Sequence, residues 1–129
     1  MNNEKNLILK EAFNLAIQNH QNNNLQNAQD YYQKVLEIDP NYAPAYNNLG
    51  TIFQQLDNNQ KAIKSYKKTI EIDPNYAIAH YNLGVIFQKL KENQKAKDCY
   101  EKAIEINPNH TNAHNNLGVI FQELKENQK

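Results

Sequence analysis

Arginine and tryptophan are missing from this sequence, and cysteine occurs only once. All 14 basic side chains are therefore lysines, and they balance 14 acidic side chains to a formal net charge of zero. Duplex nucleic acid is bound by a net positive field and usually by the planar fork of arginine. The composition therefore argues against a nucleic-acid partner and against binding to an anionic membrane surface.

Long hydrophobic runs are missing as well. No segment approaches the roughly 18 apolar residues of a membrane helix. The opening residues MNNEKNLILK lack the apolar core of a signal peptide. The lone Cys99 has no partner for an internal disulfide, which favours a reducing compartment. We therefore predict a soluble, cytoplasmic protein, with association to the cytoskeleton as a further option.

A period of 34 residues runs through the sequence. It is shared by three unrelated residue types: Pro40, Pro74 and Pro108; Ala28, Ala62 and Ala96; and Gly50, Gly84 and Gly118. The words IDPNYA and NLGVIF each recur at the same interval. Because a fixed period of this length is the signature of a repeat protein, we expect a stack of similar structural units.

Each period predicts two helices joined by a turn. In the period that starts at Ala43, one apolar stripe at helical spacing consists of Tyr46, Leu49, Gly50 and Phe53. A second stripe consists of Ala62, Ile63, Tyr66, Ile70 and Ile72. Asp57 and Asn58 interrupt the pattern between them, and Asn58 is suited to cap the second helix. Pro74 then ends that helix, because the residue before a proline leaves the helical region.

This pattern resembles the tetratricopeptide repeat, whose signature is W-x2-L-G-x2-Y, then A-x3-F, then P. One period supplies Tyr46, Leu49, Gly50, Phe53, Ala62, Tyr66 and Pro74. The next supplies His80, Leu83, Gly84, Phe87, Ala96, Tyr100 and Pro108. The first period is more diverged, with Ala12, Leu15, Ala16, Asn19, Ala28, Tyr32 and Pro40. Tyr46 and His80 thus stand where the family usually has tryptophan.

The resemblance implies an all-α fold: a right-handed superhelix of antiparallel helical hairpins, with about three and a half repeats and seven helices. We expect a single domain over residues 1–129, made of repeats 9–42, 43–76 and 77–110. A partial repeat at 111–129 would act as a capping helix over Thr111 to Leu124. The periodic glycines and alanines are expected where the two helices of a hairpin cross, because a larger side chain would separate their axes.

The first helices of such repeats line a concave groove. The predicted peptide-binding residues on them are Asn14, Asn48, Asn82 and Asn116, together with Gln54, Gln88, Thr51 and Tyr81. The four asparagines form a ladder with one amide per period. An amide donates and accepts, so it can pair with the N–H and the C=O of a peptide together. Helices roughly 9–10 Å apart would offer one amide for about every three residues of an extended chain.

The ladder is similar to the one in the superhelical part of O-linked N-acetylglucosamine transferases. A second interpretation remains open, because asparagine is also common here in consensus tetratricopeptide sequences, where it mainly suits the fold. The family also includes clamps for the C-terminal carboxylate of heat-shock chaperones. That role is less favoured here, because the inward positions lack the cations that such a clamp uses.

We therefore predict a scaffold for protein–protein interaction that binds an extended peptide or a partner helix, without catalysis and without a cofactor. One alternative is end-to-end self-association through the open C-terminal helix, where Val119, Ile120 and Leu124 are expected to be exposed. Another alternative is the substrate-holding array of a larger glycosyltransferase. The resemblance also implies chaperone, cytoskeletal or ciliary complexes as settings for such a scaffold.

Two histidines at a spacing of four residues, His110 and His114, raise the question of a metal site. No third ligand lies near them in the sequence, so structural roles are favoured and no metal is predicted. Cys99 lies on a second helix, where the preceding period has Ser65. A tolerated, partly buried position is favoured there over a nucleophile.

Overall fold

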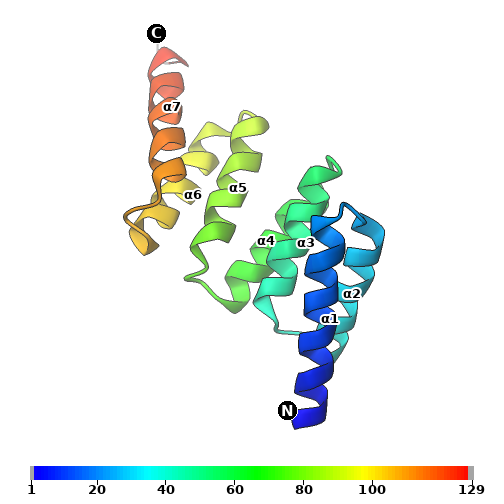
Figure 1. Ribbon diagram of the computed structural model, residues 1–129. Coiled ribbons are helices and arrows are strands. Elements are labelled where there is room, and N and C mark those ends of the chain that lie inside the picture. Colours follow the sequence, from blue (N-terminus) through cyan, green and yellow to red (C-terminus); the bar gives the residue numbers. More distant parts are fainter. Residues whose placement is uncertain (1, 128–129) are drawn as a thin grey trace. The chain divides into compact units, whose positions relative to one another are not determined.

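The structure, a computed structural model, describes residues 2–127. Within that range the chain forms seven α-helices and no strand (Figure 1). They are α1 (Asn3–Gln21), α2 (Leu25–Ile38), α3 (Ala43–Gln55), α4 (Asn59–Ile72), α5 (Ala77–Lys89), α6 (Asn93–Ile106) and α7 (Thr111–Asn127). The prediction of an all-α solenoid with seven helices is confirmed.

The two end helices differ from the expected repeat boundaries. α1 begins at Asn3, ahead of the predicted start at residue 9, and the side chain of Asn2 caps it by accepting from the Lys5 N–H at 2.8 Å. α7 runs to Asn127, beyond the expected end at Leu124. Residues 128 and 129, which end the predicted partial repeat, lie outside the described residues.

The chain divides into two compact units, and the division falls between Lys68 and Thr69 in α4. In the first unit α1 packs against α2, and α2 packs against α3 (Figure 1). In the second unit α5 packs against α6, and α6 packs against α7. Each unit is therefore a stack of antiparallel helices. The single domain over residues 1–129, the repeat boundaries and the right-handed superhelical course stay predictions.

The turn inside each hairpin reverses the chain through one residue with a positive φ. These residues are Asn23, Asp57 and Lys91, at φ values of 61°, 57° and 62°. Asn and Asp tolerate this left-handed conformation because their short side chains bond locally, whereas a lysine there carries some strain. After the second of these turns, the Asn58 side chain accepts from the Lys61 N–H at 3.2 Å, which confirms its predicted capping role.

The turn between hairpins is held by an acceptor side chain beside a proline. Asp39 accepts from the Asn41 N–H at 3.1 Å, and Asp73 accepts from the Asn75 N–H at 3.1 Å. Asn107 holds the third such turn by accepting from the Asn109 N–H at 3.3 Å. These Asx turns explain why the same acidic or amide residue precedes proline in every period.

The core of the second and third hairpins forms where a tyrosine ring meets a glycine. A Cβ atom built on Gly50 would lie 2.6 Å from the Tyr66 ring, and one on Gly84 would lie 2.7 Å from the Tyr100 ring. Both tyrosines are fully buried, as are the periodic alanines Ala28, Ala62 and Ala96. The prediction that small residues mark the helix crossings is confirmed, and the structure identifies the ring that requires the glycine.

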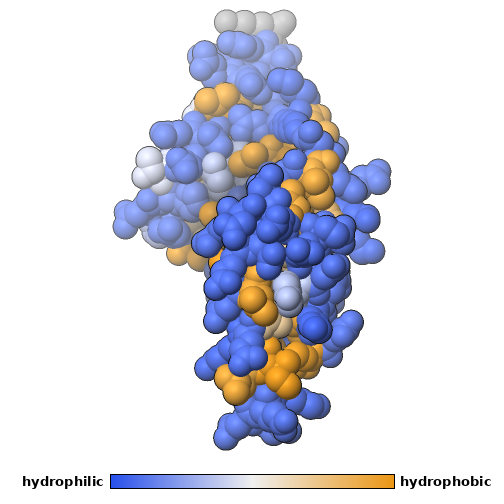
Figure 2. All heavy atoms as spheres, turned by 45° about the vertical axis from the view of Figure 1, so that its right-hand side comes forward, coloured by the Kyte–Doolittle hydropathy of each residue, from blue (hydrophilic) through white to orange (hydrophobic). Residues whose placement is uncertain are grey.

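Hydrophilic side chains cover most of the surface in view, and small apolar patches interrupt them (Figure 2). The exposed large apolar residues are Leu7, Ile8, Leu15, Leu56, Ile78, Leu90, Val119 and Phe121. In the part of the chain that the structure describes, none of the helices has both the length and the apolar character needed to cross a bilayer.

Alanine substitution at two equivalent glycines should have opposite effects. In Gly84→Ala, the new methyl group meets the buried Tyr100 ring, so we expect a loss of about 1–3 kcal/mol in the free energy of unfolding. In Gly118→Ala, nothing lies within 4 Å of the new atom. That helix should gain up to about 1 kcal/mol from the better helix former. Denaturant unfolding of both variants checks this, and equal effects would contradict the proposed ring contact.

Candidate functional site

The predicted groove residues lie on the first helix of each hairpin, as expected. Asn14 on α1 is exposed. The others are half-buried: Asn48, Thr51 and Gln54 on α3, Tyr81, Asn82 and Gln88 on α5, and Asn116 on α7. Most of these side chains therefore contact the protein as well as the solvent, and their contacts determine what is left for a ligand.

In the second compact unit, the Tyr100 hydroxyl joins two predicted site residues. It donates to the Gln88 side-chain oxygen at 2.6 Å and accepts from the Asn116 amide nitrogen at 3.3 Å. The three side chains come from α6, α5 and α7 respectively. We call this arrangement a Gln–Tyr–Asn relay. It connects one hairpin to the first helix of the next.

Parts of the same relay occur in the first compact unit. The Asn48 amide nitrogen donates to the Tyr32 hydroxyl at 3.1 Å. The Tyr66 hydroxyl donates to the Gln54 side-chain oxygen. The Thr51 hydroxyl also lies 3.2 Å from the Tyr66 hydroxyl. Site residues on α3 are thus tied to buried tyrosines on α2 and α4.

These bonds bear directly on the asparagine ladder. One amide hydrogen of Asn48 and one of Asn116 are already used within the protein. The Asn116 amide nitrogen also lies 3.5 Å from the Tyr81 hydroxyl, and the Asn48 oxygen lies 3.4 Å from the Asn47 amide nitrogen. The hydrogen bonds support the interpretation that the ladder serves the fold. Its contact with a peptide stays a prediction.

Tyr81 is partly committed to the protein too. Its ring centroid lies 4.7 Å from that of His110 and 5.8 Å from that of Tyr100. Its hydroxyl lies 3.5 Å from the Asn116 amide nitrogen, at the limit of a hydrogen bond. The ring therefore packs within the second unit, and only part of its surface is open to solvent.

The first compact unit contains a hollow of about 340 Å³ beside two of the predicted residues, Asn48 and Thr51. It is lined by Ile17, His20, Gln21, Tyr32, Asn48 and Thr51. Five of these residues lie on the first helices α1 and α3, and the sixth, Tyr32, lies on α2. We call it the groove hollow. It is a candidate place for a ligand side chain.

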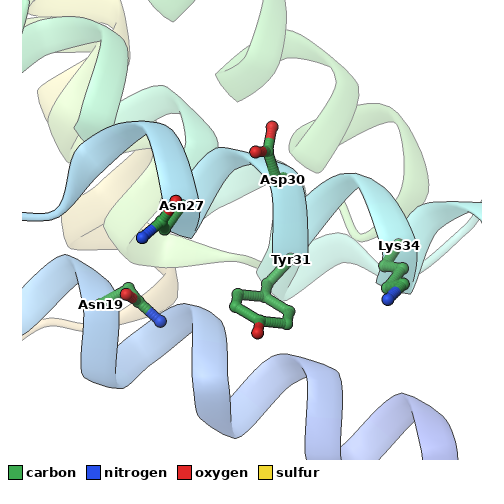
Figure 3. Close-up of a pocket in the computed structure, with 5 residues that line it drawn as sticks. All are labelled: Asn19, Asn27, Asp30, Tyr31 and Lys34. Carbon is green, nitrogen blue, oxygen red and sulfur yellow. The ribbon is translucent and has the colours of Figure 1, made fainter.

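A second hollow, between α1 and α2, contains none of the predicted site residues (Figure 3). It is lined by Asn19, Asn27, Asp30, Tyr31 and Lys34. Figure 3 shows the Tyr31 ring extending from α2 toward α1, with Asn19 and Asn27 beside it and Asp30 turned away.

The repeat explains how the second hollow arises. In later hairpins the equivalents of Asn19 are Phe53 and Phe87, each with a lysine ammonium over its ring, at 5.6 and 5.5 Å from the centroid. Where the first hairpin has Tyr31, the later ones have Ser65 and Cys99. The first hairpin thus has its aromatic ring on the second helix, whereas the later hairpins have it on the first helix. The polar hollow is what remains of the site that the phenylalanine fills elsewhere.

The histidine pair is used for local structure. The His114 imidazole lies 2.8 Å from the Pro108 carbonyl oxygen, and His80 makes the same contact with Pro74 at 3.0 Å. His110 accepts from the Ala113 N–H at 3.2 Å through its Nδ1 atom. Among residues 2–127, no three His, Cys, Asp or Glu side chains are grouped so as to hold a metal ion. His80 and His114 thus tie the preceding turn to the tryptophan position of the family.

Burial raises the pKa of two tyrosine hydroxyls. Burial raises the pKa of Tyr100 from 10.0 to about 12, and the hydrogen bond from Asn116 offsets part of that shift. Burial likewise raises the pKa of Tyr32, against the opposing effect of the bond from Asn48. Both hydroxyls therefore stay protonated at neutral pH and act as neutral donors and acceptors.

The open face of α7 is smaller than expected. Val119 is 46% exposed, but Ile120 is fully buried and Leu124 is half-buried. The prediction that Ile120 is exposed was wrong, because that side chain lies on the face of α7 that packs against α6. Phe121 is instead 48% exposed, and its ring lies 5.8 Å from the Lys97 ammonium. Together with the open Gly118, Val119 and Phe121 define what we call the α7 face.

The prediction from sequence missed the role of the tyrosine hydroxyls. A signal was available in the spacing. Tyr66 and Tyr100 each follow their glutamine partner by 12 residues. Tyr32 and Tyr100 each precede their asparagine partner by 16 residues. These constant separations are as regular as the glycine and alanine positions.

Family models for the tetratricopeptide repeat match this chain along residues 12–129. One matches 77–110, another 12–42, and a third matches two stretches, 31–64 and 99–129. A model described as a TPR repeat matches 52–91. The chain belongs to the tetratricopeptide repeat family, whose members are typically non-catalytic interaction modules. No curated protein matches its sequence.

Solved structures of similar fold include proteins with different roles. The first TPR of Spaghetti (RPAP3) bound to the HSP90 peptide SRMEEVD is 25% identical, with a TM-score of 0.84 and 97% of each chain covered. MamA is 26% identical, with a TM-score of 0.84 over 91% of this chain and 68% of that one. A mutant O-GlcNAc transferase of Thermobaculum terrenum is 22% identical, with a TM-score of 0.84. The similarity covers 93% of this chain but only 23% of that enzyme. It therefore concerns the fold alone.

Removing one hydroxyl should show what a relay contributes. Tyr100→Phe leaves Gln88 and Asn116 without their shared partner, so we expect the free energy of unfolding to fall by about 1–2 kcal/mol. Tyr31→Phe is a matched control, because its hydroxyl faces an open hollow, and it should change stability by less than about 0.5 kcal/mol. Denaturant titrations measure both.

The same pair of variants has a pH signature. The unfolded chain releases the Tyr100 proton near pH 10.0, while the folded chain holds it to about pH 12. The contribution of Tyr100 to the free energy of unfolding is therefore fully present below pH 10 and is lost as the pH rises toward 12. Tyr100→Phe should show a shallower fall, and an unchanged slope would contradict the role of burial.

Proposed function

We propose that this protein is an interaction scaffold whose first helices bind an extended peptide segment of a partner protein. The observation that carries the proposal is the groove hollow, which lies between the first helices α1 and α3. The family to which the chain belongs typically consists of interaction modules. The first TPR of Spaghetti (RPAP3), similar in fold over 97% of both chains, is bound to a peptide.

The ligand we propose is mostly held by its backbone. The first helices present amides and hydroxyls, at Asn14, Asn48, Thr51 and Asn82, and no lysine or acidic residue among the predicted site residues. Such groups satisfy the N–H and C=O groups of an extended chain without requiring a particular charge. A clamp for an acidic C-terminus is not proposed here, because it would need cations at these positions.

A cytoplasmic location and a place in a cytoskeletal or ciliary complex also remain part of this proposal. A role as the substrate-holding array of a larger glycosyltransferase is a second candidate, motivated by the asparagine ladder and by the fold that this chain shares with an O-GlcNAc transferase. It would be tested by asking whether peptides that bind this chain are glycosylated in cells that contain the full parent protein.

Self-association through the α7 face is a further candidate. The observation behind it is that Val119 and Phe121 are both nearly half exposed, beside Gly118, where an added Cβ atom would meet nothing within 4 Å. Exposed apolar surface of this kind favours association.

Selection of peptides from a random displayed library tests the main proposal. We expect the selected peptides to bind in solution, and Asn48→Ala/Asn82→Ala to weaken them by about tenfold, as the loss of one or two hydrogen bonds predicts. Lys64→Ala/Glu101→Ala, on exposed positions of α4 and α6, is the matched control and should bind as the wild type does. Calorimetry gives the affinities, after thermal melts show that all variants fold. Equal weakening by both pairs, or no selected peptide, would refute the groove.

Light scattering over a range of concentrations tests self-association. If the α7 face mediates it, the mean mass of the wild type should rise with concentration, and Val119→Lys should remain monomeric because a charge cannot be buried there. Leu56→Lys, which changes an equally exposed apolar residue on the turn after α3, is the control and should still associate. A wild type that stays monomeric at every concentration would end this candidate.

A further inference from the structure

The first hairpin departs from the Gln–Tyr–Asn relay at one residue. In the later hairpins a glutamine, Gln54 or Gln88, accepts the hydrogen bond from the buried tyrosine hydroxyl. The equivalent position in the first hairpin is His20. Its Nε2 atom lies 2.6 Å from the Gln55 side-chain oxygen, on the neighbouring first helix. The imidazole has thus turned toward α3 and not toward Tyr32.

This departure coincides with the groove hollow. Where Gln54 and Gln88 extend to their tyrosines, a side chain occupies the space beside the hydroxyl. In the first hairpin the imidazole points to Gln55, and the hollow of about 340 Å³ lies between His20, Tyr32 and Asn48. The replacement of glutamine by histidine therefore accounts for space that the later relays fill with a side chain.

The lining of the hollow determines what it can bind. Ile17 and the methyl group of Thr51 offer apolar contact, while His20, Gln21 and Asn48 offer hydrogen-bonding groups. No carboxylate and no ammonium group lines it. A charged side chain would find no opposite charge to pair with there, so it would gain none of the stronger charge-assisted hydrogen bonds. The chemistry therefore fits an uncharged side chain with an aliphatic stem and a polar end, such as glutamine or threonine.

We propose that the groove hollow is the subsite in which this protein reads one side chain of a bound peptide, and that His20 creates it. The inference rests on the proposed function, because it needs a peptide in the groove. The ladder holds the backbone of the peptide at several places, whereas this subsite selects one uncharged side chain. Specificity is thus concentrated at the groove hollow, which α1, α2 and α3 line together.

His20→Gln is the decisive variant. The new glutamine should extend to Tyr32 as in the later hairpins and close the hollow, so the melting temperature should be unchanged or higher. Peptides selected on the wild type should show one position that prefers uncharged polar side chains. On His20→Gln, that preference should disappear, and the selected peptides should bind about tenfold more weakly, as expected when a fitted side chain loses its site.

Two further variants keep the result interpretable. Ile17→Phe fills the hollow from its apolar wall and should have the same effect as His20→Gln. If one of the two variants folds poorly, the other still tests the subsite. His114→Gln makes the same chemical change on α7, which does not line the hollow, and should leave the preference intact. All three variants are compared with the wild type in thermal melts and by calorimetry with the same synthetic peptide.

Each outcome decides between distinct statements. If His20→Gln and Ile17→Phe keep the affinity and the preference, the subsite is refuted while peptide binding in the groove stands. If the wild type prefers an acidic or basic side chain at that position, the proposed ligand class is wrong. If the wild type selects no peptide at all, the proposed function fails, and the subsite fails with it.

Discussion

The second and third hairpins of this protein depend on the close approach of a tyrosine ring to a glycine. Tyr66 lies against Gly50 and Tyr100 lies against Gly84, at distances that leave no room for a methyl group. Because glycine has no side chain, the aromatic ring of one helix can lie over the backbone of the other at that position. The fold thus places its largest buried side chain opposite the smallest residue available.

That contact also fixes where the tyrosine hydroxyl lies. Because the ring is held against the glycine, its polar end emerges between first helices, where a glutamine of the same repeat and an asparagine of the next can reach it. One side chain therefore joins the apolar core to the polar wall of the groove. The groove residues are positioned by the core, which explains why most of them are half-buried and not free.

Much of the fold could be predicted from the sequence, because the features that carry it are local and periodic. The period of 34 residues located the helix crossings, the helix ends beside the prolines and the cap at Asn58. The ends of α1 and α7 were less accessible, since helix ends depend on which side chains cap them and not on the period. Ile120 was misjudged because one helix face cannot be assigned without knowing which neighbour covers it.

The candidate site was harder to predict for a related reason. A periodic asparagine looks the same in a sequence whether its amide meets a ligand or a neighbouring hydroxyl. Only the positions of Tyr32 and Tyr100 reveal that the amides of Asn48 and Asn116 are partly used. The groove hollow was also hidden, because it results from the orientation of one imidazole, which no spacing rule provides.

The exchange of the aromatic ring between Asn19 and Tyr31 has a consequence for how such a protein can change. A repeat array is often treated as a row of equivalent modules that duplicate, recombine and shuffle freely. Here the first module and the later ones solve the same packing problem with the bulky group on opposite helices (Figure 3). A chimaera that joined the first helix of one to the second helix of another would contain either two rings or none. Recombination within a hairpin therefore disrupts its packing, whereas recombination between hairpins does not. The hairpin is thus the unit that can be exchanged intact.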